Sequence, residues 1–393
     1  MSRDRQSVGD FDVVVLGGGP AGSATAMTLA RHGVARILLV EAGRYQTIRI
    51  GESVPPDIRI VLQELGVWPA FLTQGHEPCL GSCSSWGGDT LGYNDFLFNP
   101  LGHGWHLDRR QFDAFLAQEA ATCGVALCMG TRFDGCRRAG EGGFVVRLRS
   151  ADDEIRTVAA RFLVDATGLR SCFARHAGAR RLFLDQLLCI TGFFDLPDAI
   201  SFSRLTMLEA VEYGWWYAAR LPDNRLAVSV ATDADIAKRK ALRRRDGWLG
   251  HLAATRHIAA ALAGCRFVEG SQMASAAPSF LLDRVAGSDW LAVGDAASAY
   301  DPISSQGIHK ALTDGVRAGE AVAASLRGSD IKRDEYQSSL ALRFRRYREN
   351  RNYFYGIERR WPTSAFWTKR RASAAPEPAR PAAVGITASA GHA

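Results

Sequence analysis

The feature that most constrains the fold is a strand, glycine turn, helix and strand in succession near the N-terminus. Residues 11–16 (FDVVVL) form a continuous apolar run that is typical of a strand buried in a parallel sheet. A glycine-rich turn over residues 17–22 follows, and residues 23–32 predict a helix that ends at Gly33. Residues 36–40 predict a second buried strand. This βαβ unit predicts an α/β fold built on a parallel sheet.

The turn has the glycine spacing of a dinucleotide-binding loop, G-x-G-x-x-G. Gly17 permits the tight turn, Gly19 lets the backbone approach a pyrophosphate, and Gly22 lets the helix pack closely on the strand. Glu41, after the second strand, suits the hydroxyls of an unphosphorylated ribose, which favours FAD or NAD over NADP. A purely structural glycine turn is the alternative. The residues predicted to bind the nucleotide here are Gly17, Gly19, Pro20, Ala21, Gly22 and Glu41.

Three later segments distinguish FAD from NAD. Residues 289–293 (DWLAV) predict a buried strand that runs into a Gly-Asp pair ending at Asp295, and residues 161–165 predict another that ends shortly before Gly168. Arg109 begins an R-x-x-F-D sequence at a predicted helix start. In this order the segments resemble the second FAD motif, the "ATG" strand end and the Arg-bearing helix of the glutathione-reductase-type flavoproteins. The resemblance implies FAD, whereas a helix-capping role is the alternative for Arg109 and its neighbours.

The rest of the chain predicts strands of an antiparallel sheet and a helical C-terminal segment. The expected fold class is therefore α/β, with a glutathione-reductase-type, Rossmann-like FAD-binding domain, an antiparallel β-sheet substrate domain and a C-terminal helical segment. The predicted boundaries are 1–55, 104–178 and 280–330 for the FAD-binding domain, 56–103 and 179–279 for the sheet domain, 331–371 for the helical segment, and 372–393 for a disordered tail.

Composition and charge narrow the class of protein. The chain of 393 residues is 47% hydrophobic and 23% charged, which is ordinary for a globular protein, and it has no apolar run long enough to span a membrane. The N-terminus lacks a signal-peptide cleavage site, so a cytoplasmic location is expected. None of the eight cysteines has the spacing of a zinc site, and reduced thiols without a metal are predicted.

The positive charge is concentrated in one C-terminal segment. Residues 332–371 contain twelve Lys or Arg and four Asp or Glu, a net charge of +8, whereas the whole chain carries +7. Three interpretations are open for this basic and aromatic segment: a helix with a solvated face, a docking surface for a protein substrate, and single-stranded nucleic acid binding. The first two are favoured, and no nucleic-acid partner is predicted.

Further motifs narrow the resemblance. Residues 51–56 (GESVPP) and 294–312 (GDAASAYDPISSQGIHKAL) resemble two segments of the flavin-dependent halogenases and their relatives. Residues 353–371 resemble the C-terminal Tyr/Arg/Trp segment of tryptophan halogenase-like members. The chain is identified as a member of this superfamily, which includes geranylgeranyl reductases and aromatic hydroxylases. The resemblance implies that further FAD contacts come from Ser53, Gly168, Asp295, Ser305, Gln306, Gly307 and Ile308.

Departures from the halogenase pattern point away from halogenation. Tryptophan-type halogenases have a catalytic Lys after the G-E-x-x-P segment, but residues 1–237 contain no Lys. Their G-W-x-W-x-I-P motif reads GWWYAAR over residues 214–220, and their S-[ST]-G stretch reads SQG over residues 305–307. The whole-chain pattern most resembles the flavoprotein monooxygenases that hydroxylate a tryptophan of a partner protein during maturation of a tryptophylquinone cofactor.

The resemblance implies a mechanism and its partners. Reduced FAD would react with O2, the co-substrate, to give a C4a-hydroperoxide that transfers oxygen to an electron-rich aromatic ring, an indole. The electrons would come from NAD(P)H or from a partner flavin reductase, and the sequence leaves both open. The alternatives are a halogenase, a geranylgeranyl reductase-like enzyme and a non-catalytic flavin-bound assembly scaffold.

Three residues are candidates for catalysis. Glu52 would position the substrate or accept the proton that an aromatic ring loses, and a helix-capping role is its alternative. His106 would orient the substrate or transfer a proton, although such a histidine is more often structural. Trp216, between Trp215 and Tyr217 on a predicted strand, would form a substrate wall, with packing as its alternative.

Overall fold

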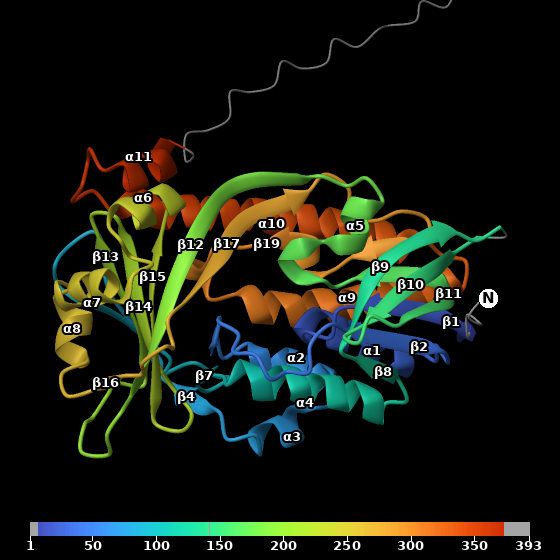
Figure 1. Ribbon diagram of the computed structural model, residues 1–393, viewed down its shortest axis with the longest axis horizontal. Coiled ribbons are helices and arrows are strands. Elements are labelled where there is room, and N and C mark those ends of the chain that lie inside the picture. The colour runs from blue at the N-terminus through green and yellow to red at the C-terminus, as the bar shows by residue number, and fades with distance from the viewer. Residues whose placement is uncertain (1–6, 141, 373–393) are drawn as a thin grey trace, which may run out of the picture.

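A mostly parallel sheet contains the N-terminal strand that leads into the glycine turn (Figure 1). The computed structural model describes residues 7–140 and 142–372. The strand order of this first sheet is β8-β2-β1-β11-β10-β9, and β18 pairs with β11. Its strands are β1 (Ser7–Leu16), β2 (Ile37–Glu41), β8 (Ala126–Met129), β9 (Thr131–Arg138), β10 (Phe144–Ser150), β11 (Ile155–Asp165) and β18 (Trp290–Ala292).

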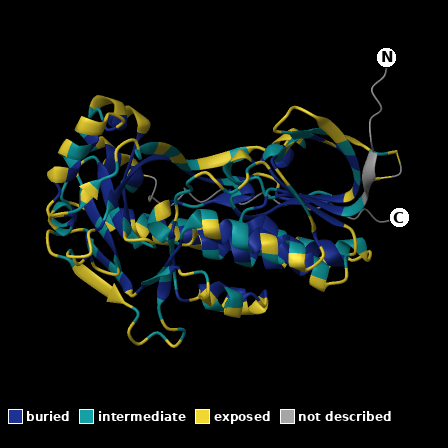
Figure 2. Ribbon diagram, turned by 60° about the horizontal axis from the view of Figure 1, so that its bottom comes forward, coloured by how far each residue is buried: buried dark blue, intermediate teal, exposed yellow. Residues whose placement is uncertain are grey.

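Helices cover this sheet and explain why its central strands are apolar throughout. Val13, Val14 and Val15 of β1 are fully buried, as expected for a parallel strand with both faces covered. The first sheet is packed with α1 (Pro20–Arg31), α4 (Arg109–Thr122), α5 (Cys172–His176) and α9 (Gly307–Leu326). Figure 2 shows the buried strands inside and the exposed helix faces outside.

The second sheet is mainly antiparallel, in the order β19-β17-β12-β15-β14-β13-β5-β6, with β16 paired to β12. Its strand β12 has 15 residues and runs across the top of Figure 1 between the two parts of the molecule. Its strands are β5 (Gly81–Ser85), β6 (Gly92–Asp95), β12 (Arg181–Asp195), β13 (Leu205–Val211), β14 (Gly214–Leu221), β15 (Arg225–Thr232), β16 (Arg266–Phe267), β17 (Met273–Leu282) and β19 (Ser298–Ala299).

Both faces of the second sheet are packed. On one face Trp216 of β14 packs against Trp248, with ring centroids 5.1 Å apart. Trp248 belongs to the helical insertion of α6 (Ala234–Arg239), α7 (Arg245–Ala253) and α8 (His257–Ala261). On the other face Trp215 packs with Tyr355 and Trp367 of the C-terminal helices. The alternation along β14 therefore sends neighbouring tryptophans into different cores.

Short elements join the two sheets. Strands β3 (Ser53–Val54), β7 (Gly104–His106) and β4 (Glu77–Cys79) form a small antiparallel sheet. Helices α2 (Ile58–Glu64) and α3 (Trp68–Leu72) pack into the core of the first sheet through Ile58, Leu62 and Phe71. The segment 56–103, predicted to belong to the sheet domain, thus contributes to both cores.

The C-terminal helices are fixed by a cluster of buried charges. Helix α10 (Ile331–Ile357) lies along α9, and α11 (Ala365–Ala372) packs at its far end. Arg351 of α10 donates to Asp185 of β12 and, at 3.2 Å, to Asp301 in the turn before α9. Arg370 of α11 donates to Asp185 at 3.1 Å and to Asp233 at 2.7 Å. Removing one partner from such a cluster leaves an uncompensated buried charge.

The α/β class predicted from the sequence is confirmed, including the antiparallel sheet and the helical C-terminal segment. The glycine turn and the strand ends lie where the sequence predicts them, because each depends on a local pattern. The proposed domain boundaries remain a prediction, and nearly all of the predicted tail, residues 373–393, lies outside the described residues. Within the described chain, the helices lack the combination of length and hydropathy that crossing a bilayer requires.

Close contact between α1 and α9 generates the first testable prediction. A Cβ atom at Gly315 of α9 would lie 2.6 Å from the carbonyl oxygen of Ala21, so Gly315→Ala should force the helices apart. We expect a loss of about 1–3 kcal/mol in the free energy of unfolding, measured by urea denaturation. Gly250→Ala is the control, because Gly250 lies in α7 with open space around it; this change should stabilise the protein by about 0.5–1 kcal/mol. Equal stabilisation by both changes would contradict the close packing.

Candidate functional site

A cavity of about 790 Å³ lies between the two sheets. One half is lined by the carboxyl ends of β1, β2 and β11 together with the start of α9, and the other half by β12, β14, β15 and β17 of the second sheet. Ligands of open α/β sheets bind at the carboxyl ends of the strands, and this volume is in the range of small-molecule and cofactor sites. The cavity is therefore the candidate active site.

The three motif glycines have different structural roles. A Cβ atom at Gly17 would overlap the carbonyl oxygen of Ala166, and one at Gly22 would overlap the carbonyl oxygen of Gly17. Gly17 also has a φ of +109°, which disfavours other residues. At Gly19, by contrast, the nearest atom to an added Cβ is an Arg49 nitrogen 4.0 Å away. The fold requires Gly17 and Gly22, whereas the space in front of Gly19 belongs to the cavity and fits a pyrophosphate.

A network of charges lines the same half of the cavity. Glu41 accepts hydrogen bonds from the Gly18 amide at 2.8 Å and from Arg49 at 3.0 Å. Arg49 also donates to the buried Asp113 at 2.8 Å, and Arg109 donates to Asp113 at 3.1 Å through each of two nitrogens. Burial disfavours the charged form of Arg49, but Asp113 and Glu41 outweigh it and raise its pKa. Two permanently charged guanidinium groups are thus held beside the nucleotide loop, where they suit a phosphate.

The start of α9 faces the cavity at the other end of this half. Ser305 adopts a left-handed conformation with a φ of +48°, and Gly307 and Ile308 begin the helix at the cavity wall. The free amides at a helix start favour negative charge. The predicted FAD contacts that line the cavity are Gly17, Gly19, Pro20, Ala21, Glu41, Ser53, Arg109, Gly168, Asp295, Ser305, Gly307 and Ile308. Gly22, which packs against the turn, and Gln306, which is exposed, do not line it.

The second sheet supplies an aromatic and largely uncharged wall. Trp215 and Tyr217 of β14 line the cavity together with Cys189, Ser229 and the segment 275–278. Asp301 and Glu52 also line the cavity and add carboxyl groups. The arginines among the lining residues come instead from the nucleotide half: Arg49, Arg109, Arg132 and Arg170. The lining arginines thus lie in the nucleotide half, which also carries the carboxyl groups of Glu41 and Asp295, whereas the described residues of the second sheet add no cation to the lining.

The three candidate catalytic residues have different positions. Glu52 lines the cavity and accepts a hydrogen bond from the Gly51 amide at 2.8 Å; burial raises its pKa. His106 is completely buried behind the wall, and burial lowers its pKa to about 4, so it is neutral at physiological pH. Trp216 points away from the cavity into the core around Trp248, and its indole donates to the Tyr213 hydroxyl at 3.2 Å. Of the three, only Glu52 faces the cavity.

Some residues of the site escape sequence reasoning. Arg49 belongs to no motif, and its contact with Asp113 joins positions 64 residues apart. Cys189 and Ser229 sit in strands whose alternation predicts two faces but not which face borders the cavity. The same alternation could have paired Tyr217 with Trp215, since both lie on the face opposite Trp216.

Comparison with known proteins places this geometry among flavoproteins. The sequence matches the tryptophan halogenase family model over residues 12–93 and 89–389. It is 30% identical over 370 residues to LodB of Marinomonas mediterranea, whose name describes an FAD-dependent oxidoreductase, covering 93% of this chain and 98% of that protein. It is 29% identical over 344 residues to the flavin-dependent halogenase armH3 of Armillaria mellea, covering 81% of this chain and 68% of that protein.

Solved structures of related enzymes also superpose on this chain. The flavin-dependent halogenase CmlS superposes with a TM-score of 0.81 at 25% identity, covering 91% of this chain and 67% of CmlS. QhpG, a peptidyl tryptophan dihydroxylase essential for tryptophylquinone cofactor biogenesis, superposes with a TM-score of 0.70 at 27% identity, covering 92% of this chain and 79% of QhpG.

The open space at Gly19 leads to a prediction about FAD. Gly19→Val should fill the place of the pyrophosphate without disturbing the fold, because the nearest protein atom lies 4.0 Å from the added Cβ. We expect the purified variant to lose bound FAD, measured by absorbance and isothermal titration, while its apo form melts at the temperature of the parent apoprotein. Gly22→Val is the contrasting variant and should lower that melting temperature, since it clashes with the backbone. Full FAD retention by Gly19→Val would refute the site.

Proposed function

The chain belongs to the tryptophan halogenase family of FAD-dependent oxidoreductases, and we propose that within it the protein is a monooxygenase of an aromatic ring. The substrate we propose is the indole of a tryptophan in a partner protein, hydroxylated during biogenesis of a quinone cofactor. FAD, when bound and reduced, supplies the activation of O2 and the oxygen transfer. The electrons come either from NAD(P)H that binds transiently or from a partner flavin reductase.

The uneven distribution of charge in the cavity carries this proposal. A free amino acid needs a cationic partner for its carboxylate, but among the described residues no Lys or Arg lines the half of the cavity formed by Trp215 and Tyr217. A tryptophan within a polypeptide has no free carboxylate and needs no such partner. The aromatic wall provides the face-to-edge contacts that an indole ring favours.

A halogenase is the second candidate, because the family and several of its relatives carry that name. The catalytic lysine expected in such an enzyme has no counterpart in the described part of the cavity wall. Among the described cavity-lining residues there is no Lys. Lys310 of α9 is buried, and its ammonium contacts the Ser298 carbonyl at 2.5 Å and Asp295 at 3.3 Å. These contacts hold the ammonium group away from the aromatic half.

In the proposed reaction the protein binds the cofactor, orients the substrate ring and accepts a proton. The loop at Gly19, the start of α9 and the two guanidinium groups of Arg49 and Arg109 hold the cofactor. Trp215 and Tyr217 orient the ring, and the two sheets exclude water from it. Glu52 accepts the proton that the ring carbon loses when aromaticity returns, a role that suits a buried carboxylate whose pKa is raised by burial.

The mass of the reaction product distinguishes the candidate functions. With FADH2, O2, chloride and bromide, we expect a tryptophan-containing polypeptide substrate to gain one or two oxygen atoms and free tryptophan to react poorly, as measured by mass spectrometry. A halogenated product that depends on the enzyme would promote the second candidate. Addition of two hydrogens would indicate a reductase of the geranylgeranyl type, and an unmodified partner that remains bound would indicate a scaffold.

The exposed part of the C-terminal segment is suited to binding that polypeptide. Arg345, Arg346, Tyr353 and Phe354 are exposed on α10. Other members of the basic and aromatic segment serve the fold: Arg343 pairs with Asp314, Arg360 pairs with Glu358, Arg351 is in the buried cluster, and Tyr347, Tyr355 and Trp367 are buried. Arginine and aromatic side chains are frequent anchors of protein interfaces.

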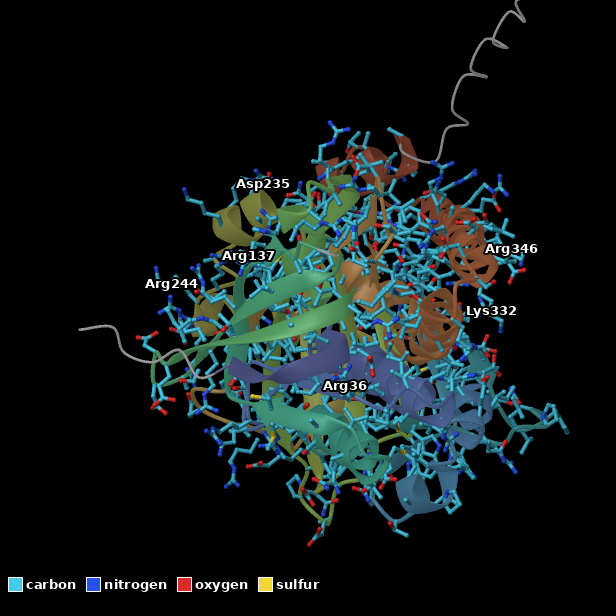
Figure 3. The ribbon with its side chains drawn as sticks, turned by 90° about the vertical axis from the view of Figure 1, so that its right-hand side faces the viewer. Arg36, Arg137, Asp235, Arg244, Lys332 and Arg346 are labelled. Atoms are coloured by element: carbon cyan, nitrogen blue, oxygen red, sulfur yellow. The ribbon has the colours of Figure 1, made fainter. Side chains whose placement is uncertain are left out.

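Substitution of the exposed arginines tests this surface. Arg345→Ser with Arg346→Ser should weaken binding of the polypeptide substrate about three- to tenfold and reduce its salt dependence, while FAD stays bound. The matched control is Arg243→Ser with Arg244→Ser, a second exposed pair on a different side of the molecule; Figure 3 labels Arg346 and Arg244. Binding is measured by titration at several salt concentrations. Equal effects of the two double variants would argue for general charge attraction instead of a docking surface.

A further inference from the structure

A chain of hydrogen-bonded side chains runs from the aromatic wall of the cavity into the protein. The Tyr217 hydroxyl lies 2.8 Å from the Ser53 hydroxyl, which lies 3.1 Å from the Thr206 hydroxyl. The Thr206 hydroxyl in turn lies 2.8 Å from Nε2 of His106. At the cavity end, Tyr217 and Glu52 line the same cavity, and the interaction with the Tyr217 hydroxyl favours the charged form of Glu52 by lowering its pKa. The members come from four separate strands, so the tertiary fold, and not proximity in sequence, brings them together.

The ends of this chain set the direction of its hydrogen bonds, because each hydroxyl can both donate and accept. An ionised Glu52 accepts from Tyr217, so Tyr217 accepts from Ser53. By the same logic Ser53 accepts from Thr206, and the Nε2–H of His106 donates to Thr206. His106 is fully buried, and its Nδ1 has no hydrogen-bond partner within the described chain. Bonds aligned in one direction polarise and strengthen one another.

Glu52 also borders a second, much smaller pocket. This pocket has a volume of about 30 Å³, which is enough for one water molecule. Its wall includes the turn between β14 and β15, where Asp223 is exposed. Glu52 therefore stands between the main cavity and a water-sized, polar space near the surface. The charged side chains that line this pocket with Glu52 are Arg49, Asp108, Arg109, Arg110, Asp223 and Arg225.

We propose that Tyr217 is a second catalytic residue, which relays a proton from the substrate to Glu52, and that Ser53, Thr206 and His106 are positioning residues. This inference rests on the proposed function. The C–H bond of the oxygenated ring carbon breaks and its electron pair returns to the ring. The proton passes to the Tyr217 oxygen as the hydroxyl proton of Tyr217 passes to the Glu52 carboxylate. Glu52 then releases its proton into the small pocket, so that both residues return to their starting forms.

The protonation of Glu52 supplies a test that needs no substrate. Burial raises the pKa of Glu52 and the hydrogen bond from Tyr217 opposes this rise; of the groups around it, Arg109 also favours the carboxylate, and Cys189 of β12 faces it as a neutral thiol. Infrared titration of the FAD-bound enzyme follows the carboxylic acid C=O band, which Glu52→Gln assigns by removing it. Tyr217→Phe should shift the titration upward by about one to two pH units, because the carboxylate loses a donor.

Variants of the inner chain separate positioning from mere packing. Thr206→Val removes the hydroxyl but keeps the shape, so it should shift the Glu52 titration in the same direction by less, and Thr206→Ser should restore the parent value. Thr232→Val is the matched control, since Thr232 is a buried threonine of the same sheet that donates to the Tyr213 carbonyl outside the chain. This control should leave the Glu52 titration unchanged. An unshifted titration in Tyr217→Phe, or equal titrations in Thr206→Val and Thr232→Val, would overturn the proposal.

The activity assay distinguishes failure of the relay from failure of the proposed function. If the polypeptide is oxygenated, Tyr217→Phe should lower kcat at least tenfold and change its pH profile with KM nearly unchanged. An oxygenated product with a parental pH profile in Tyr217→Phe rejects the relay and leaves the proposed function standing. Absence of oxygenation in the parent enzyme rejects the proposed function and, with it, the catalytic role of Tyr217. The infrared titration still decides whether the series of hydrogen-bonded side chains controls the protonation of Glu52.

Discussion

The buried pairing of Arg351 with Asp301 and Asp185 joins three parts of the molecule that are distant in sequence. Asp185 belongs to the long strand β12, Asp301 to the turn that leads into α9, and Arg351 to the C-terminal helix α10. Burial raises the pKa of Asp301, and Arg351 opposes this rise. Loss of one partner from a buried ion pair costs about 3–5 kcal/mol, a large part of the stability of a typical domain. The position of α9, and thus of the amides at its start, depends on this cluster.

The same cluster extends the cavity wall into the C-terminal segment. Tyr355 donates to Asp301 at 2.9 Å and accepts from the indole nitrogen of Trp215 at 3.1 Å. Both partners line the cavity, although Tyr355 itself does not. Residues 331–372 are therefore a structural wall on one side and an exposed basic helix on the other. This arrangement is the helix with a solvated face, one of the interpretations that the composition of the segment left open, and the docking surface stays a proposal.

The nucleotide half of the site is the part that a sequence can predict, because its pattern depends on local spacing. Gly17, Gly19 and Gly22 lie within six residues; backbone contacts require glycine at Gly17 and Gly22, and Gly19 leaves open the space proposed for the pyrophosphate. The second half depends on tertiary pairing that a single sequence does not reveal. The pairing of Arg351 with Asp185 joins residues 166 positions apart, and either face of β14 could have bordered the cavity. Because of this ambiguity the sequence pattern favours Trp216, although Trp215 and Tyr217 form the wall.

Cys189 is a thiol in the cavity wall whose surroundings affect its oxidation. It lines the space in which oxygen would be activated, and peroxide that escapes such a reaction attacks thiolates far faster than thiols. Burial raises the pKa of Cys189 to about 12, with further contributions from the carboxylates of Asp301 and Glu52. At neutral pH the sulfur therefore keeps its proton almost entirely and resists conversion to sulfenic acid. Burial of the thiol, with a smaller contribution from the two carboxyl groups, thereby also protects the enzyme from self-inactivation.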